Sequence, residues 1–383
     1  MADQTKSIIA GGSGDYTTIQ GWEDASDVST GFWKGEINDN SAYDETVVIA
    51  GSTGTDSATN YVWLTGGASN SHVGVAGTSH ARLATDTASG HCITVSEDYF
   101  RLSKLEIKQI SPGTSDEGIR VTSNMNDVVL EKCIIWTDSA TADTDGIYSG
   151  NWAVSSLNID NCAVYGWARG GMNLQNYDSS NTAEWNIDFC TIIGCGATGE
   201  VESGGIVNGE HSDSTTIINV YNTFCGDTAS TYQDFNGYDH GGGGTPAWTG
   251  TNNACTDGSL TSEGIATNAQ ESLTVDDSAQ GSGSYFLVVS EVGGSEDYNL
   301  LDDSAANKAY GNAINRVGSE PDARQDFSID IVGNARSTAS PGPDIGAFEF
   351  IASGGGRIMG GLAYHGGLAG KGGIAGIGGG LAA

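Results

Sequence analysis

One short apolar pattern returns five times between residues 102 and 225. Each copy has three apolar or small positions, with two residues between the first pair and one between the second. The copies begin at Leu102, Leu130, Ile159, Ile187 and Val220, so successive copies start 28, 29, 28 and 33 residues apart. A period in this range indicates a repeat architecture, in which each unit packs on the next.

The residues between these positions favour short strands over helices. They are rich in Gly, Ser, Thr, Asn and Asp, which form turns, and they lack the 3.6-residue spacing of a helical repeat. A second signal, a glycine followed by an apolar residue, recurs at Gly118, Gly146, Gly171 and Gly205. Units stacked about 4.8 Å apart would pair every strand with its neighbour. The pattern therefore predicts an all-β parallel β-helix, with a bulge or corner at each two-residue gap.

The repeat also predicts which side chains stack inside the coils. Six equivalent positions form the expected core ladder: Leu130, Cys133, Ile159, Cys162, Ile187 and Cys190. The chain has seven cysteines, an odd number, and no pair at zinc-site spacing. A bridge between two of the three ladder thiols would leave the third unmatched, so we expect reduced cysteines that pack as small apolar residues.

Three carboxylates, Glu131, Asp160 and Asp188, occupy equivalent positions beside the ladder. If the register holds, their side chains point outward about one coil spacing apart. We expect a solvated acidic face, because Asp and Glu account for 48 of 383 residues. Two alternatives remain open: a Ca²⁺ site, and a catalytic pair, since retaining glycosidases hold two carboxyl groups about 5–5.5 Å apart. No other cofactor is expected, because no phosphate loop or dinucleotide fingerprint is present.

The net charge and the N-terminal residues limit the functions that we expect of this chain. Fifteen basic and 48 acidic residues give a net charge of −33, which repels phosphate backbones and argues against nucleic-acid binding. Residues 1–7 contain no apolar signal core, so we do not expect secretory export. The composition is typical of exposed proteins, yet the chain is expected to be made in a cytoplasm. A virion component fits both expectations, because it is made inside a host cell and released by lysis.

Residues 354–383 have a different composition, dominated by a hexad that begins with Gly-Gly and carries large aliphatic residues. Six residues make two turns of a three-residue extended helix, which would align the aliphatic side chains on one side. We expect this tail to dock onto a protein surface, with disorder or membrane insertion as alternatives. The residues expected to make the attachment are Arg357, Leu362, Tyr364, Leu368, Ile374 and Leu381.

Two segments resemble a known family. The ending Asp344-Ile345-Gly346-Ala347-Phe348-Glu349, with Asp330 and Arg336 upstream, resembles the last coil of right-handed parallel β-helix proteins of the pectate-lyase-like group. The opening Gly14-Asp15-Tyr16-Thr17-Thr18-Ile19-Gln20 resembles the N-terminal cap of that group. The resemblance implies a right-handed, single-stranded β-helix over roughly residues 8–351. It implies no single function, because this fold carries lyases, hydrolases, adhesins and phage tailspikes.

These observations predict three parts: an N-terminal arm and cap (1–29) with a short helix capped near Thr17 or Thr18, a parallel β-helix (30–351), and the Gly-rich tail (352–383). The tail loosely resembles polyglycine stretches of phage tip adhesins. We therefore expect a bacteriophage structural protein on the virion surface, as a capsid decoration, head fibre, tail fibre or spike. Its expected partners are other virion proteins and further copies of itself, since β-helix virion proteins often trimerise. The alternatives are a tailspike that binds or degrades host polysaccharide, and a bacterial surface adhesin.

Overall fold

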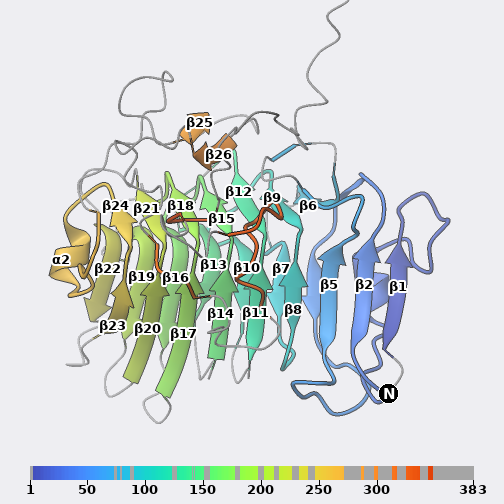
Figure 1. Cartoon of the computed structure of the whole chain (residues 1–383). Helices are drawn as coiled ribbons and strands as arrows, with labels where there is room; N and C mark the ends of the chain where they lie inside the picture. Colours follow the sequence, from blue (N-terminus) through green and yellow to red (C-terminus); the bar gives the residue numbers. More distant parts are fainter. Residues whose placement is uncertain are drawn as a thin grey trace, which may run out of the picture. The chain divides into compact units, whose positions relative to one another are not determined.

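The computed structural model forms three parallel sheets wound into a β-helix (Figure 1). Each coil gives one strand to each sheet, and seven coils, from β2–β4 to β20–β22, are complete. The predicted fold class, a right-handed single-stranded parallel β-helix, is confirmed. The structure describes residues 3–270, except 73–75, 78–79, 87–89, 123–126, 140, 142, 151–155, 177–181, 197–201, 211–214, 227–232 and 240–245, and then 286–288, 297–300, 313–316, 325–336 and 344–347.

The three sheets follow one another around each coil. Sheet 1 has nine strands: β1 (Gln4–Ile8), β2 (Trp33–Ile37), β5 (Val62–Gly66), β8 (Arg101–Ser103), β11 (Val128–Glu131), β14 (Ser156–Asp160), β17 (Thr182–Asp188), β20 (Thr215–Tyr221) and β23 (Ala247–Thr251). Sheet 2 has eight: β3 (Ala42–Tyr43), β6 (Arg82–Thr85), β9 (Glu106–Gln109), β12 (Ile134–Thr137), β15 (Ala163–Tyr165), β18 (Thr191–Ile193), β21 (Phe224–Gly226) and β24 (Ala254–Cys255). Sheet 3 has seven: β4 (Val47–Ile49), β7 (Ile93–Val95), β10 (Glu117–Val121), β13 (Asp145–Ser149), β16 (Gly170–Asn176), β19 (Gly204–Glu210) and β22 (Gln233–Asp239).

The core ladder stacks as the spacing predicts. Leu130 pairs with Ile159, and Ile159 pairs with Ile187, in neighbouring strands of sheet 1, and all three side chains are fully buried. The thiol of Cys162 points at the carbonyl oxygen of Leu130 one coil away, 3.7 Å distant. All seven cysteines are buried and free of disulfides, in agreement with the expectation of reduced packing residues.

The corner between sheets 1 and 2 is built from one residue in the left-handed region. Six successive coils place a residue with φ between 51° and 58° there: Lys104, Lys132, Asn161, Phe189, Asn222 and Asn252. The next residue of the coil turns inward, as Cys133 does after Lys132. This conformation bends the chain sharply within one residue, which explains the two-residue gap in the repeat.

The glycines of the second repeat signal lie at the entry to sheet 3, where the chain runs close to the opposite wall. A Cβ atom on Gly205 would lie 1.9 Å from the sulfur of Cys225, and one on Gly146 would lie 2.5 Å from a methyl carbon of Val164. No side chain fits at this distance, so the sequence repeats glycine here. The following residue resumes the inner stack, with Ile119 paired to Ile147 in the next coil.

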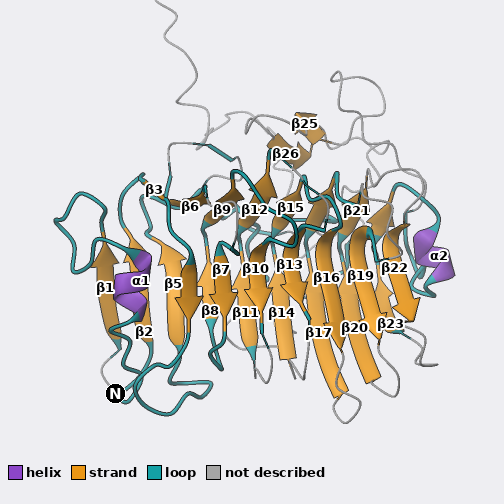
Figure 2. Ribbon diagram, turned by 180° about the vertical axis from the view of Figure 1, so that it is seen from behind, coloured by secondary structure: helices purple, strands orange, loops and turns teal. Residues whose placement is uncertain are grey.

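Short helices lie at the two ends of the coil stack (Figure 2). Helix α1 (Ile19–Glu23) begins after Thr18, whose hydroxyl oxygen accepts a hydrogen bond from the Gly21 N–H at 3.0 Å, so the expected cap near Thr17 or Thr18 lies at Thr18. Strand β1 pairs in register with β2, so residues 4–8 form the first strand of sheet 1. Helix α2 (Ser259–Ser262) packs near β22 and β24.

A C-terminal strap, defined by the described residues 313–316, 325–336 and 344–347, lies on the outer face of sheet 2 (Figure 1, orange to red). It forms a second apolar core, separate from the inner one. Phe327 is fully buried and meets the ring of Phe189 edge-on, with centroids 5.7 Å apart. The other strap residues in this core are Ala313, Ile331, Ile345 and Ala347.

The rest of the chain adds little described structure. Strands β25 (Phe286–Val288) and β26 (Asp297–Leu300) pair antiparallel. The chain divides into two units, Met1–Ile351 and Ala352–Ala383, and the second lies outside the described residues, together with every expected attachment residue from Arg357 to Leu381. The three-part division and the docking role of the tail stay predictions. Among the described residues, no helix is long and apolar enough to span a membrane.

Candidate functional site

The three ladder carboxylates lie in register, but their side chains are buried. Glu131 pairs with Asp160, and Asp160 with Asp188, at the ends of β11, β14 and β17. All three are at most 2% exposed. The expectation of a solvated face is therefore wrong, because the C-terminal strap covers the positions that point away from the coil.

The strap supplies partners to this acidic row. Gln325 donates a hydrogen bond from Nε2 to Asp160 Oδ1 at 2.9 Å. Arg316 Nε lies 2.9 Å from Asp188 Oδ1 as an ion pair, although the N–H does not point along the line between them. On the other side, Arg101 on β8 donates to the carboxylate of Glu131. Asp160 and Asp188 thus fasten the strap to two successive coils, and Arg101 links Glu131 to the coil before it.

Burial changes the acidity of this row. It raises the pKa of Asp160 to about 7, and the neighbouring Glu131 carboxylate adds to the effect. It also raises the pKa of Asp188, against the opposing attraction of Arg316. Crowded carboxylates of this kind can hold a proton or a cation, so the Ca²⁺ and catalytic alternatives for these three residues stay untested predictions.

Aromatic side chains that could have stacked on sugar rings pack within the protein. Trp136 and Tyr165, neighbours in sheet 2, stack with centroids 5.6 Å apart and are at most 3% exposed. Trp167 and Trp185 belong to the inner core. These four aromatic side chains therefore contribute to packing.

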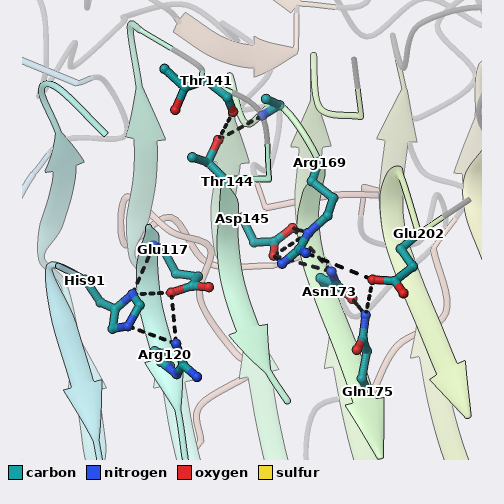
Figure 3. Close-up of polar contacts among 11 residues, drawn as sticks. His91, Glu117, Arg120, Thr141, Thr144, Asp145, Arg169, Asn173, Gln175 and Glu202 are labelled. Carbon is teal, nitrogen blue, oxygen red and sulfur yellow. Dashed lines mark hydrogen bonds and ion pairs between the residues drawn. The ribbon is translucent and has the colours of Figure 1, made fainter. Parts of the chain in front are cut away.

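A second set of titratable residues lies on the outer face of sheet 3 (Figure 3). Glu117 on β10 contacts the Nδ1 atom of His91 and is 2% exposed. Arg120 donates a hydrogen bond to His91 Nε2 at 3.0 Å, and the Glu117 backbone N–H donates one to His91 Nδ1 at 3.2 Å. The three residues form a closed chain of contacts, with His91 and Arg120 partly exposed.

The next coils continue this row with a second carboxylate (Figure 3). Asp145 pairs in register with Glu117 and is fully buried. Arg169 donates from Nε to Asp145 Oδ2 at 3.0 Å, and Asn173 donates to the same oxygen at 3.3 Å. Gln175 then links Asn173 and Glu202 through hydrogen bonds of 2.9 and 3.0 Å from its Nε2 atom. We call these residues the sheet 3 row: His91, Glu117, Arg120, Asp145, Arg169, Asn173, Gln175 and Glu202.

Burial raises the pKa of Asp145 to about 7, with the charge of Glu117 in the same direction and Arg169 opposing both. A carboxyl group with this pKa beside a second carboxylate is a candidate proton donor or acceptor near neutral pH. Sequence reasoning missed the pair, although both acids directly precede the repeated glycines Gly118 and Gly146. An acidic residue directly before a repeated glycine was the sequence signal that could have identified these two carboxylates.

A third cluster contains possible metal ligands. Ligand atoms of Asp234, Cys255 and Asp257 lie within 4.8 Å of one another. Their oxygens already accept protein hydrogen bonds: Asp234 Oδ2 from the Thr256 N–H at 2.7 Å, and Asp257 Oδ1 from the Ser259 N–H at 2.9 Å. Burial raises the pKa of the Cys255 thiol to about 12, which disfavours the thiolate that a metal requires. The contacts fit a turn that leads into α2.

Comparisons with known proteins bear on the fold. No family model and no curated protein matches the chain. Among solved structures, it is similar to the pectate lyase Pel9A, with a TM-score of 0.40, 9% identity, and coverage of 91% of this chain and 97% of that one. It is also similar to two forms of a pectin methylesterase from Aspergillus niger, with TM-scores of 0.37 and 0.36, identities of 15% and 16%, and coverage of 71% of this chain and 90% of each of those. At these identities the likeness concerns the fold alone.

Proposed function

We propose that the chain is a structural protein of a bacteriophage particle, exposed at the particle surface and held there through residues 352–383. The observation that carries the proposal is the use of the buried carboxylates. The strap covers the ladder carboxylates, and positively charged side chains of neighbouring coils pair with carboxylates of the sheet 3 row. Carboxylates paired in this way tie neighbouring coils and the strap together, as a rigid spacer on a particle requires. The hexad composition of the tail supports the point of attachment.

The proposal is tested by removing the tail. A chain lacking residues 354–383 should keep its β-helix, because the described body makes its own contacts, yet be absent from purified particles when it replaces the full chain. Immunoblots of gradient-purified particles measure incorporation, and circular dichroism of the purified truncated protein confirms its fold. Light scattering on both forms reports whether the tail also sets the number of chains per assembly. Normal incorporation of the folded truncated chain would contradict the docking role.

The sheet 3 row favours a second candidate, a protein that hydrolyses host polysaccharide. Glu117 and Asp145 lie on adjacent coils, and the pKa of Asp145 near 7 suits a general acid. Reducing ends released from capsule of the host would reveal activity. Glu117→Gln and Asp145→Asn should each abolish it, while Glu202→Gln, a carboxylate of the same row at its partly exposed end, should retain most of it. Release of sugar that survives both substitutions would rule out this pair.

A further inference from the structure

The outer face of sheet 2 carries a groove at the end nearer the N-terminus, before the part that the strap covers. Its volume is about 350 Å³. Ala42 on β3 and Ala84 on β6 line the groove, and their small side chains leave space. Lys108 pairs in register with Ala84, and Trp136 pairs with Lys108, so these two side chains continue the lining toward the strap. We name this hollow the sheet 2 groove.

Arg82 lines the groove and has few partners. Its Nη1 atom donates one hydrogen bond, to the Gly77 carbonyl oxygen at 2.5 Å. No carboxylate of the described residues lies within ion-pair distance of it, although acidic residues outnumber basic ones by 48 to 15. A guanidinium group carries five N–H donors in a planar fork, so most of them remain available to an incoming acceptor.

The nearest carboxylate in register does not compete for Arg82. Glu106 pairs with Arg82 across β6 and β9, but its own oxygens are already used. They accept hydrogen bonds from Trp136 Nε1 at 2.7 Å and from the Gly77 N–H at 3.1 Å, and one of them contacts His80. Glu106 also lines the groove, but it is fully buried and these partners occupy its oxygens.

The other side of the groove supplies a second cation and two acceptors. Lys108 Nζ lies 4.1 Å from the ring centroid of Trp136 and 2.6 Å from Asp138. Asp44 and Asp86 lie at the rim and are exposed. A bare anion would meet repulsion from these two carboxylates, whereas hydroxyl groups on the same ligand could donate to them.

We propose that the sheet 2 groove binds a small organic oxyanion, a carboxylate or sulfate group carried on a hydroxyl-bearing body about one sugar ring in size. Arg82 holds the oxyanion through two parallel N–H donors, and Asp44 and Asp86 accept hydrogen bonds from the hydroxyl groups. The groove volume lies at the lower end of the range of ligand sites in proteins. The inference is independent of the attachment of the chain to a particle.

Trp136 gives a direct readout of binding. Its indole N–H signal, identified among the eight tryptophans by its loss in Trp136→Phe, is followed by NMR while the full chain is titrated with glucuronate, inorganic sulfate or glucose. We expect glucuronate to shift the signal and glucose to leave it unchanged. Sulfate distinguishes the source of affinity: binding as tight as that of glucuronate means that the oxyanion alone suffices, and weaker binding means that the hydroxyl groups contribute.

Variants separate the groove from general charge effects. Arg82→Gln should weaken glucuronate binding about tenfold or more, while Lys6→Gln, which removes the same charge on sheet 1, should leave it unchanged. Ala42→Leu fills the hollow without altering charge and should also abolish binding, which keeps the test valid if Arg82→Gln is poorly folded. The proposal is overturned if no anion shifts the Trp136 signal, if glucose binds as well as glucuronate, or if Lys6→Gln loses as much affinity as Arg82→Gln.

Discussion

At the scale of single residues, the corner between sheets 1 and 2 demands one backbone conformation from chemically different side chains. Asparagine fills it in three coils, but Lys104, Lys132 and Phe189 fill it in others. Left-handed backbone costs a residue with a large side chain about 1–2 kcal/mol, and asparagine tolerates it better. Phe189 is held there by the ring of Phe327 and by Arg336, whose guanidinium carbon lies 3.8 Å from the Phe189 ring centroid.

Lys104 is exposed, so its corner can be improved without loss of packing. Lys104→Asn should raise the free energy of unfolding by about 0.5–1 kcal/mol, because asparagine adopts positive φ at lower cost. Lys104→Gln, which removes the same charge without favouring this backbone, is the matched control and should change stability little. Chemical denaturation of both variants measures the difference. Equal stability of the Asn and Gln variants would show that the corner is not strained at Lys104.

At the scale of elements, the C-terminal strap decides what the outer face of sheet 2 can do. It buries apolar side chains of β12, β15 and β18, and it covers the ladder carboxylates. One polar contact reaches far along the sequence: Arg336 donates to Asn161 Oδ1 at 2.5 Å. Within the strap, Arg336 also donates to the Gly346 carbonyl oxygen at 3.1 Å. The strap is therefore held by a few contacts with the coils rather than by strand pairing.

Removing the central apolar contact should release the strap and leave the coils intact. Phe327→Ala should destabilise the docked strap by about 3–5 kcal/mol, since Phe327 is fully buried. Hydrogen exchange should then speed up in residues 325–336 while sheet 1 stays protected. Val332→Ala, at a partly buried position of the same strap, should have a much smaller effect. Equal exchange in all three proteins would mean that the polar contacts alone hold the strap.

The difference between coils and strap also explains what the sequence could predict. The coils follow from a local rule, because the same apolar spacing recurs at Leu130, Ile159 and Ile187 and stacking is the one way to bury it. The strap has no such repeat. Arg316 and Gln325 each meet one carboxylate more than a hundred residues earlier, and nothing in their neighbouring residues marks the pairing. The burial of the acidic row could therefore not be predicted, although its register was.

At the scale of the whole molecule, buried acids determine how stability depends on pH. Burial raises the pKa of Glu23, Asp56, Asp145 and Asp160 to about 7 in each case. The folded chain thus binds more protons than the unfolded chain between about pH 4 and pH 7, and stability falls as pH rises through this window. His72 acts in the opposite direction, because its burial lowers its pKa to about 4. The four raised pKa values outweigh the one lowered pKa, so we expect the folded chain to be most stable under mildly acidic conditions.

The melting temperature should accordingly be several degrees higher at about pH 5 than at about pH 8. General repulsion within a chain of charge −33 would give the same trend, but salt screens it. The trend should therefore persist in about 1 M NaCl, and Asp145→Asn should reduce it. Differential scanning calorimetry at the two pH values measures both effects. A trend that disappears in salt would assign it to surface charge.

Seven free thiols are distributed along the axis of the coil stack, from Cys92 on the early coils to Cys255 on the last. Burial raises the pKa of the ones in the middle of the stack, such as Cys133 and Cys162, so they do not react while their coils are closed. Each thiol therefore becomes accessible to an alkylating reagent when its own coil opens. The protein carries a built-in series of probes that can reveal from which end the solenoid unravels.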